Sequence, residues 1–335
     1  MIELDGSGGG GQVLRSALAF AALTGEPFHA TGIRGGRPEP GLRPQHLAAV
    51  ELVGDVCDAA VSDAAVGSRE LTFRPGPVGG GRYTAAIGTA GSVALLFDAV
   101  LPLAAAVEDP LVVVARGGTD VKWAPTMAYY RTTKLPLLRR HGLHAVVEVD
   151  RPGFYPVGGG RATLRVAPST LSRFDLTARG AFAGARIHSL AAPALAEAEV
   201  AERQAARATA RLDDAGLAAV ERTVRYADAD SPGSAVAVRL DYGDALAGFD
   251  ALGERGTPAE TVAETAVADA LAFHGGTAAV DRHAADQVLP FLALAGGRMR
   301  IPEATEHVET GTGLLAAFGF EASVERDGDG VVVEA

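Results

Sequence analysis

The chain has 335 residues, and 48% of them are hydrophobic, which is enough for the core of one large domain or two smaller ones. No stretch approaches about 20 uninterrupted apolar residues, and the first residues, MIELDGSGG, lack the regions of a signal peptide. We therefore expect a cytoplasmic protein without a membrane segment. The formal net charge of −11 excludes a broadly basic nucleic-acid coat, although a local basic cleft stays compatible with it.

The first predicted elements are a short strand, a glycine loop and an apolar helix, in DGSGGGGQVLRSALAF at residues 5–20. Such a loop can bind phosphate, because free backbone N–H groups and the positive end of the helix dipole meet there. It is not a Walker-type P-loop, since G-x-x-x-x-G-K-[ST] is absent and only Lys122 and Lys134 are lysines. Neither lysine precedes the x-D-G that we expect around the adenylated lysine of a nucleic-acid ligase.

A glycine- and proline-rich loop, IRGGRPEPGLRPQH, follows the second predicted strand. It contains Arg34, Arg37 and Arg43, and it leads into Gln45 and His46. A guanidinium group binds phosphate through two parallel hydrogen bonds, so this clustering favours an anionic ligand. Ordinary solvated surface arginines are the alternative.

An internal repeat of about 80 residues organises the first half of the chain. PVGGGR occurs at 77–82 and again at 156–161, and the apolar helix after the first glycine loop has a counterpart in GTAGSVALLF, which begins at Gly88. Each unit has the pattern of a strand, a glycine turn, a helix, a strand, a polar loop, a second helix and two closing strands. The prediction is two β-α-β-α-β-β units.

The polar loop of the second unit contains aromatic residues in place of arginines. Lys122, Trp123, Pro125, Tyr129 and Tyr130 lie in or just after it. Aromatic faces beside a proline can stack on a base. Packing of the tyrosines in the core explains them equally well.

A third unit is predicted to begin at RATLRVAP, to break off, and to resume near residue 255. The intervening segment, 178–254, has an alanine-rich amphipathic helix between strand-like stretches, which favours a small inserted α/β domain. We therefore predict a three-repeat domain formed by 1–177 and 255–335.

Histidine chemistry is predicted near the C-terminus. His307 lies in EATEHVETGTG, where Glu306 and Glu309 flank it and can orient its imidazole and stabilise its cationic form. A solvated loop end is the alternative. Asp286, in the upstream stretch ADQ, has the position of a helix N-cap.

Together these segments resemble the RNA 3′-terminal phosphate cyclase family (RNA cyclase, type 1). The motifs that carry the resemblance are GGGGQVLRSAL, TGEPF, IRGGRPEPGLRPQHL, GTAGS, GGTD with APT, GFYPVGGG, HAADQVLPFLALAGG and the final His307. They cover nearly the whole chain. The resemblance implies an α/β (α+β) fold of three β-α-β-α-β-β repeats like the C-terminal domain of translation initiation factor 3, with a small α/β domain inserted in the third repeat.

The resemblance also implies a reaction. Family enzymes use ATP and a divalent metal, Mg²⁺ or Mn²⁺, to convert an RNA 3′-terminal phosphate into a 2′,3′-cyclic phosphate. His307 matches the nucleophile, which would attack the α-phosphate of ATP, release pyrophosphate and form a covalent histidinyl-AMP. The AMP would then pass to the RNA to give RNA-(3′)pp(5′)A, and the 2′-hydroxyl would close the ring and release AMP.

Carried over by position, the resemblance assigns two further sets of residues. The ATP site would contain Asp98, Pro125, Tyr129, His283, Ala284, Ala285, Asp286 and Gln287. Phosphates of ATP or of the RNA end would be held by Arg15, Arg34, Arg37, Arg43 and Gln45.

Two departures from the family pattern bear on this assignment. The family often has Gln where this chain has Asp98, and it commonly has a metal-binding Glu where this chain has Gly8. The metal ligands are therefore left open among Glu3, Asp5 and Asp286, or the metal depends mainly on the ATP phosphates.

Two other functions remain as alternatives. A non-catalytic, cyclase-like scaffold for RNA processing or ribosome biogenesis would lack the nucleophilic histidine. An enolpyruvyl transferase shares a related repeat architecture, but those chains are longer and carry different basic clusters.

Overall fold

Glycine turns and apolar helices alternate with short strands in the first unit of the computed structural model, which describes residues 1–8, 10–328 and 330–335. Helix α1 ends where Gly25 adopts a left-handed conformation, with φ of 75°, and donates its N–H to Ala21. The unit consists of β1 (Ile2–Asp5), α1 (Gly11–Thr24), β2 (Phe28–Thr31), α2 (Pro44–Val56), β3 (Ala60–Ser62) and β4 (Leu71–Arg74). Its sheet has the order β1-β2-β4-β3.

The second unit repeats this arrangement. Ser92 caps α3 by accepting a hydrogen bond from the backbone N–H of Leu95 at 3.2 Å. The elements are β5 (Gly81–Ala86), α3 (Val93–Val100), η1 (Leu101–Ala105), β6 (Leu111–Gly117), α4 (Met127–Tyr129), η2 (Tyr130–Lys134), α5 (Leu135–Arg139), β7 (Ala145–Arg151) and β8 (Gly160–Val166). The sheet order, β5-β6-β8-β7, matches that of the first unit position by position.

The third sheet has the same strand order but is interrupted in sequence. Its elements are β9 (Phe174–Leu176), α8 (Arg282–Ala295), β14 (Gly297–Ile301), α9 (Glu306–Ala317), β15 (Ser323–Asp327) and β16 (Gly330–Glu334). The sheet runs β15-β16-β14-β9, and β9 pairs with β14 in parallel. The stretch RATLRVAP was predicted to open this unit, but most of it forms β8, because it pairs with β6 and β7 and completes the second sheet.

A fourth sheet lies between β9 and α8 in sequence. It has the order β11-β10-β12-β13, and the segment consists of β10 (Phe182–Ala191), η3 (Pro193–Leu195), α6 (Val200–Asp214), β11 (Ala219–Tyr226), β12 (Ser234–Tyr242), β13 (Leu246–Leu252) and α7 (Ala259–Gly275). Buried alanines of α7, such as Ala263 and Ala266, share a hydrophobic cluster with Val236 and Val238 of β12. This packing favours an inserted unit that extends through α7, beyond the predicted end at 254.

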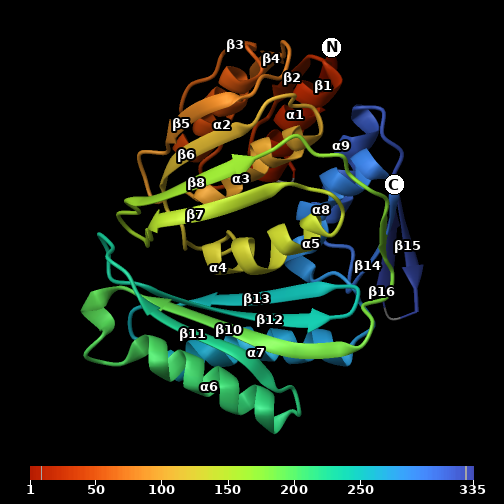
Figure 1. Ribbon diagram of the computed structural model, residues 1–335. Coiled ribbons are helices and arrows are strands. Elements are labelled where there is room, and N and C mark those ends of the chain that lie inside the picture. The colour runs from red at the N-terminus through yellow and green to blue at the C-terminus, as the bar shows by residue number, and fades with distance from the viewer. Residues whose placement is uncertain (9, 329) are drawn as a thin grey trace.

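Helices from all three repeated units meet in one hydrophobic core. The rings of Phe20 on α1 and Phe318 after α9 are 5.9 Å apart, and both belong to a cluster that also contains side chains of α2, α3 and α8. Figure 1 shows these helices between the sheets, with the fourth sheet, α6 and α7 at the bottom of the view. The mixed α/β class is confirmed. Among the described residues, no helix has the length and apolar character needed to cross a bilayer.

Candidate active site

His307 lies in the first turn of α9 and contacts the beginning of α1. Thr305 caps α9 by accepting from the backbone N–H of Val308 at 3.3 Å, which places the partly exposed His307 side chain at the helix N-terminus. Gln12 contacts it twice: Oε1 meets imidazole Nδ1, and Nε2 donates to the His307 carbonyl at 3.4 Å. Because the amide NH₂ is used on the carbonyl, Oε1 accepts and Nδ1 carries the proton. The lone pair on Nε2 of the His307 imidazole is then available as a nucleophile.

Alternating charges continue inward from His307. Its Nδ1 lies 3.8 Å from Asp286 Oδ2 on α8, and Asp98 on α3 pairs with the buried Lys134 at 2.6 Å. Burial lowers the pKa of the Arg15 guanidinium, while the charges of Asp98 and Asp286 raise it. Burial raises the pKa of the Asp286 carboxyl, and the charges of His307 and Arg15 oppose this. Each buried charge is thus compensated by neighbours of opposite sign, as burial requires.

The predicted ATP residues are divided between surface and core. His283 is exposed and Asp286 and Gln287 are half-buried, whereas Pro125, Ala284 and Ala285 are buried. Of the predicted set, the part that faces His307 is the turn of α8 that contains Asp286. Asp98 is held by its ion pair with Lys134, so its carboxylate is engaged within the protein.

Tyr129 is buried at 1% exposure in this conformation. Its hydroxyl donates to the Asp281 carboxylate, 3.0 Å from Oδ1, and its ring packs against Gly248, where an added Cβ would approach the ring to 2.6 Å. The N-cap of α8 is Asp281, which accepts from the backbone N–H groups of His283 and Ala284, and not Asp286 as predicted. Asp281 stands one residue before the start of the helix, and an aspartate at that position in the sequence is itself an N-cap signal.

The first glycine loop packs tightly against the arginine loop. A Cβ at Gly11 would overlap the ring of His46, a residue not assigned to the site from sequence. Burial and the charges of Arg15, Arg34 and Arg43 lower the pKa of His46 to about 3, so its imidazole is neutral. A Cβ at Gly10 would lie 3.1 Å from the Arg37 guanidinium. Glycine is therefore required here for close approach and for more than turn geometry.

The three loop arginines have different partners. Arg34 donates to the carbonyls of Glu39 at 2.8 Å and Gly41 at 3.0 Å, and Arg43 forms an ion pair with Glu39. In the described part of the chain, the Arg37 guanidinium has neither a hydrogen bond nor an ion pair. Arg34 and Arg43 thus shape the loop, and of the three guanidinium groups only that of Arg37 has no partner among the described residues.

Gln45 joins the first unit to the second. Its Oε1 accepts from the backbone N–H of Ser92 at 2.6 Å, at the cap of α3. The amide oxygen therefore links the start of α2 to the glycine turn of the second unit.

Metal ligands are sparse around His307. The described residues contain no group of three or more His, Cys, Asp or Glu that could hold an ion. Of the three candidate carboxylates, Glu3 pairs with His29 at 3.0 Å and Asp5 accepts from Ser7. Asp286 is the candidate that lies beside His307. Mg²⁺ is commonly held by one or two carboxylates and substrate phosphates, and this donor set fits a metal carried largely by ATP. A Cβ at Gly8 would meet no atom of the described residues within 4 Å, so packing there does not require a glycine.

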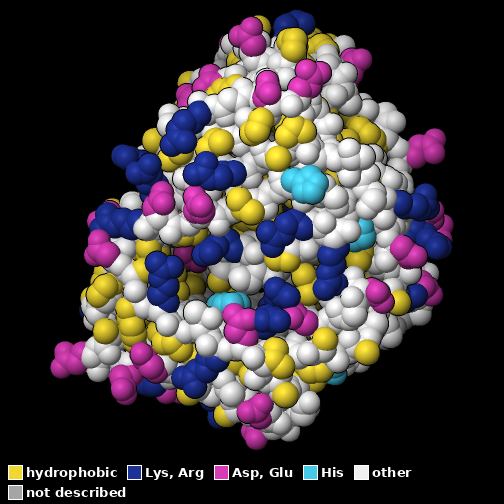
Figure 2. Space-filling view, viewed as in Figure 1, with side chains coloured by type: hydrophobic (Ala, Val, Ile, Leu, Met, Phe, Trp, Pro, Cys, Tyr) yellow, Lys and Arg dark blue, Asp and Glu magenta, His cyan; other side chains and the backbone are white. Residues whose placement is uncertain are grey.

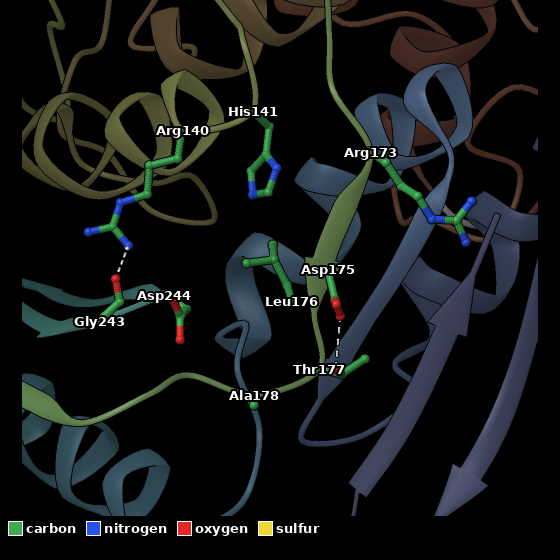
Figure 3. A pocket seen from close by; sticks show the side chains of 9 residues that line it. All are labelled: Arg140, His141, Arg173, Asp175, Leu176, Thr177, Ala178, Gly243 and Asp244. Atoms are coloured by element: carbon green, nitrogen blue, oxygen red, sulfur yellow. Dashed lines mark hydrogen bonds between the residues drawn. The ribbon is translucent and has the colours of Figure 1, made fainter.

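A cavity of about 470 Å³ lies elsewhere, between the end of α5, β9 and the turn after β12. Its lining contains two basic and two acidic side chains, those of Arg140, Arg173, Asp175 and Asp244. Figure 3 shows Arg140 directed at the carbonyl of Gly243, at 3.5 Å, and the Arg173 guanidinium turned away from the other side chains. The cavity contains none of the predicted site residues.

Comparisons with known proteins identify similar chains. A family model described as RNA 3′-terminal phosphate cyclase matches residues 7–322. An RNA 3′-terminal phosphate cyclase of Halobacterium salinarum is 49% identical over 345 residues, covering 99% of both chains, and one of Pyrococcus furiosus is 38% identical, covering 95% of this chain and 93% of its own. A solved enolpyruvyl transferase, NikO from Streptomyces tendae, covers 49% of this chain and 31% of its own at 17% identity and a TM-score of 0.27.

Proposed function

Because the chain belongs to the RNA 3′-terminal phosphate cyclase family, we propose that it converts an RNA 3′-phosphate into a 2′,3′-cyclic phosphate in an ATP-dependent reaction. The observation that carries this proposal is the contact between Gln12 and His307. Two residues 295 positions apart are brought together so that a histidine is oriented at a half-exposed helix N-terminus. A solvated loop end would need no such partner.

In the proposed first step, Nε2 of His307 attacks the α-phosphorus of ATP. The bond from that phosphorus to the bridging oxygen breaks, and pyrophosphate leaves. Gln12 keeps the proton on Nδ1 and stabilises the charge that develops on the ring as the N–P bond forms. The product is a phosphoramidate between His307 and AMP.

In the second step, an oxygen of the RNA 3′-phosphate attacks the same phosphorus and the N–P bond breaks. This gives RNA-(3′)pp(5′)A and returns the histidine. The neighbouring 2′-hydroxyl then attacks the terminal RNA phosphorus, loses its proton, and displaces AMP. A terminal phosphate is a poor electrophile, so the adenylate serves to provide a good leaving group.

Cationic side chains would hold the phosphates during these steps. Arg37 has a guanidinium without an acidic partner among the described residues, and Arg15 lies among the acidic groups behind His307. Asp286 would hold a divalent metal together with ATP oxygens, and that metal would neutralise phosphate charge. The helix N-terminus at His307 adds a partial positive charge.

A non-catalytic scaffold is the second candidate, and one observation favours it: Gly8 stands where the family commonly has a carboxylate. Such a protein would bind RNA ends without taking up AMP. Covalent labelling therefore separates the two functions.

The test is incubation with ATP labelled at the α-phosphate and with Mg²⁺ or Mn²⁺, followed by denaturing electrophoresis. We expect a covalent label that survives alkali and is lost in acid, and we expect none in His307→Ala. His144→Ala, at an exposed histidine in the second unit, is the matched control and should label normally. An unlabelled wild-type protein, or equal labelling of His307→Ala, would refute the histidinyl-AMP mechanism.

A further inference from the structure

Three arginines occupy neighbouring positions across the outer face of the second sheet. Arg116 of β6 is paired in register with Arg161 of β8, which is paired with Arg151 of β7. Like charges in opposing positions repel. Arg151 is paired with Asp228 at 3.0 Å and with Asp230 at 2.8 Å, and Arg161 is paired with Asp150 at 3.3 Å. Arg116 has no acidic partner among the residues the structure describes. The charge of Arg116 is therefore the one in this row left for an anion to compensate among the described residues.

Two exposed aromatic rings lie at the same end of this sheet. Trp123 is 94% exposed and Tyr155 is 74% exposed. Their loops run side by side, because Asp120 and Phe154 form a parallel bridge, and these loops directly follow β6 and β7. Trp123 also has a left-handed backbone with φ of 61°, which is unfavourable for a tryptophan. Proteins that bind single-stranded nucleic acids combine exposed aromatic rings, which stack on bases, with arginines, which contact phosphates.

The surface is linked to the first unit through the glycine turn of the second unit. The loop that contains Tyr155 lies on the glycine turn of the second unit, since a Cβ at Gly158 would be 2.8 Å from Ala90 Cα. The same turn donates a backbone N–H, from Ser92, to Gln45 at the start of α2, directly after the arginine loop of the first unit. Figure 2 shows Lys and Arg side chains gathered over this sheet, at the left of the view, on a molecule whose net charge is −11.

We propose that Trp123, Tyr155 and the row of Arg151, Arg161 and Arg116 bind the unpaired nucleotides that precede the 3′-phosphate of the RNA substrate. This inference rests on the proposed function and extends it from the reacting end to the RNA body. The rings provide stacking without base specificity, and the arginines follow the backbone. A duplex would hide its base faces from both rings, so the expected occupant is single-stranded.

The single tryptophan of the chain gives a direct readout. Emission of Trp123 is titrated with a 3′-phosphorylated, unstructured RNA of 12 nucleotides and, separately, with a 3′-phosphorylated dinucleotide, both without ATP. We expect quenching by the 12-mer and little by the dinucleotide. Unchanged emission at RNA concentrations that saturate binding, measured by anisotropy of end-labelled RNA, would overturn the proposal.

Variants then test the surface in the reaction. Trp123→Ala with Tyr155→Ala, or Arg116→Gln alone, should raise KM for the 12-mer at least tenfold and leave KM for the dinucleotide and self-labelling by ATP unchanged. Arg82→Gln, on the same face of β5 but at the opposite end of the sheet, is the matched control. Equal loss for both RNA lengths, or no loss for either, would contradict the surface. Failure of wild-type self-labelling would instead contradict the proposed function, while the emission titration still decides the binding surface.

Discussion

Topologically equivalent connections of the first two units carry different chemistry. The connection from β2 to α2 contains Arg34, Arg37 and Arg43, and it packs on the glycine loop beside His307. The connection from β6 to α4 contains Lys122 and Trp123, and it leaves the tryptophan ring in solvent. Because the sheets have the same strand order, the fold supplies the same position twice. The difference teaches that side-chain content alone distinguishes the arginine-rich connection, a proposed phosphate site, from the connection with the exposed tryptophan, a proposed surface for bases.

The largest expected effect concerns the charges behind these connections. Lys134→Met removes the partner of Asp98 in a buried pair of 2.6 Å, so the free energy of unfolding should fall by about 3 kcal/mol. Lys122→Met breaks an exposed pair with Glu254 in the second connection and should cost less than about 1 kcal/mol. Urea unfolding measures both variants. Equal losses of stability would show that the exposed pair of Lys122 and Glu254 contributes as much to folding as the buried pair of Lys134 and Asp98.

The next effect concerns the first glycine loop. Gln12→Leu removes the acceptor that orients the imidazole, so adenylate formation should slow by about 100-fold while the protein stays folded. Gln12→Glu keeps an acceptor oxygen and should restore most of the rate. Rapid-quench labelling with ATP gives the rates, and circular dichroism gives the fold. A Gln12→Leu enzyme with a normal rate would remove Gln12 from the mechanism.

A third test addresses the anchor of the second connection. Asp120 accepts from Thr119 at 2.6 Å and from the backbone N–H of Met127 at 3.0 Å, and burial raises its pKa to about 6. Between pH 4 and 6, the Asp120 carboxyl is therefore protonated in the folded protein and ionised in the unfolded chain. Its contribution to the free energy of unfolding falls as pH rises through that window.

Asp120→Asn should remove this contribution, which is about 2 kcal/mol between pH 4.5 and 6.5. Unfolding by urea at the two pH values, for wild type and variant, isolates it from other titrating groups. An unchanged pH dependence in the variant would mean that Asp120 is ionised throughout.

The smallest effect separates the arginines of the first connection. Arg37→Gln removes the guanidinium that has no acidic partner among the described residues, and it should raise KM for ATP or for the RNA end about tenfold, equivalent to about 1.4 kcal/mol. Arg43→Gln, whose guanidinium is already paired with Glu39, should change KM less. Steady-state kinetics would contradict this assignment if Arg43→Gln had the larger effect.

The sequence was most informative where the repeat was intact. Offsets near 80 residues predicted two similar units, and their sheets have the same strand order. The third unit was misplaced because its first strand, Phe174–Leu176, is only three residues long and carries little pattern. Alanine-rich α7 gave no indication of which sheet it covers, since alanine packs on almost any apolar face.

Motifs indicated which residues to assign to the proposed site, but they did not indicate the contacts between those residues. The resemblance pointed to His307 and Asp286, and the structure places them 3.8 Å apart. The contact of His307 with Gln12 spans 295 positions, so no local pattern could indicate it. Burial of Tyr129 against Asp281 likewise depends on packing between the second unit and the inserted sheet. The roles in ATP and RNA binding stay predictions.

The central claim is best tested on the RNA end itself. An RNA carrying a labelled 3′-phosphate is incubated with the protein, divalent metal and ATP, and the label is then challenged with phosphatase. The account predicts a phosphatase-resistant, cyclic end only when ATP is present, with one AMP formed per end and no conversion by His307→Ala. A terminal phosphate that stays fully sensitive with the wild-type protein, or equal conversion by His307→Ala, would contradict it.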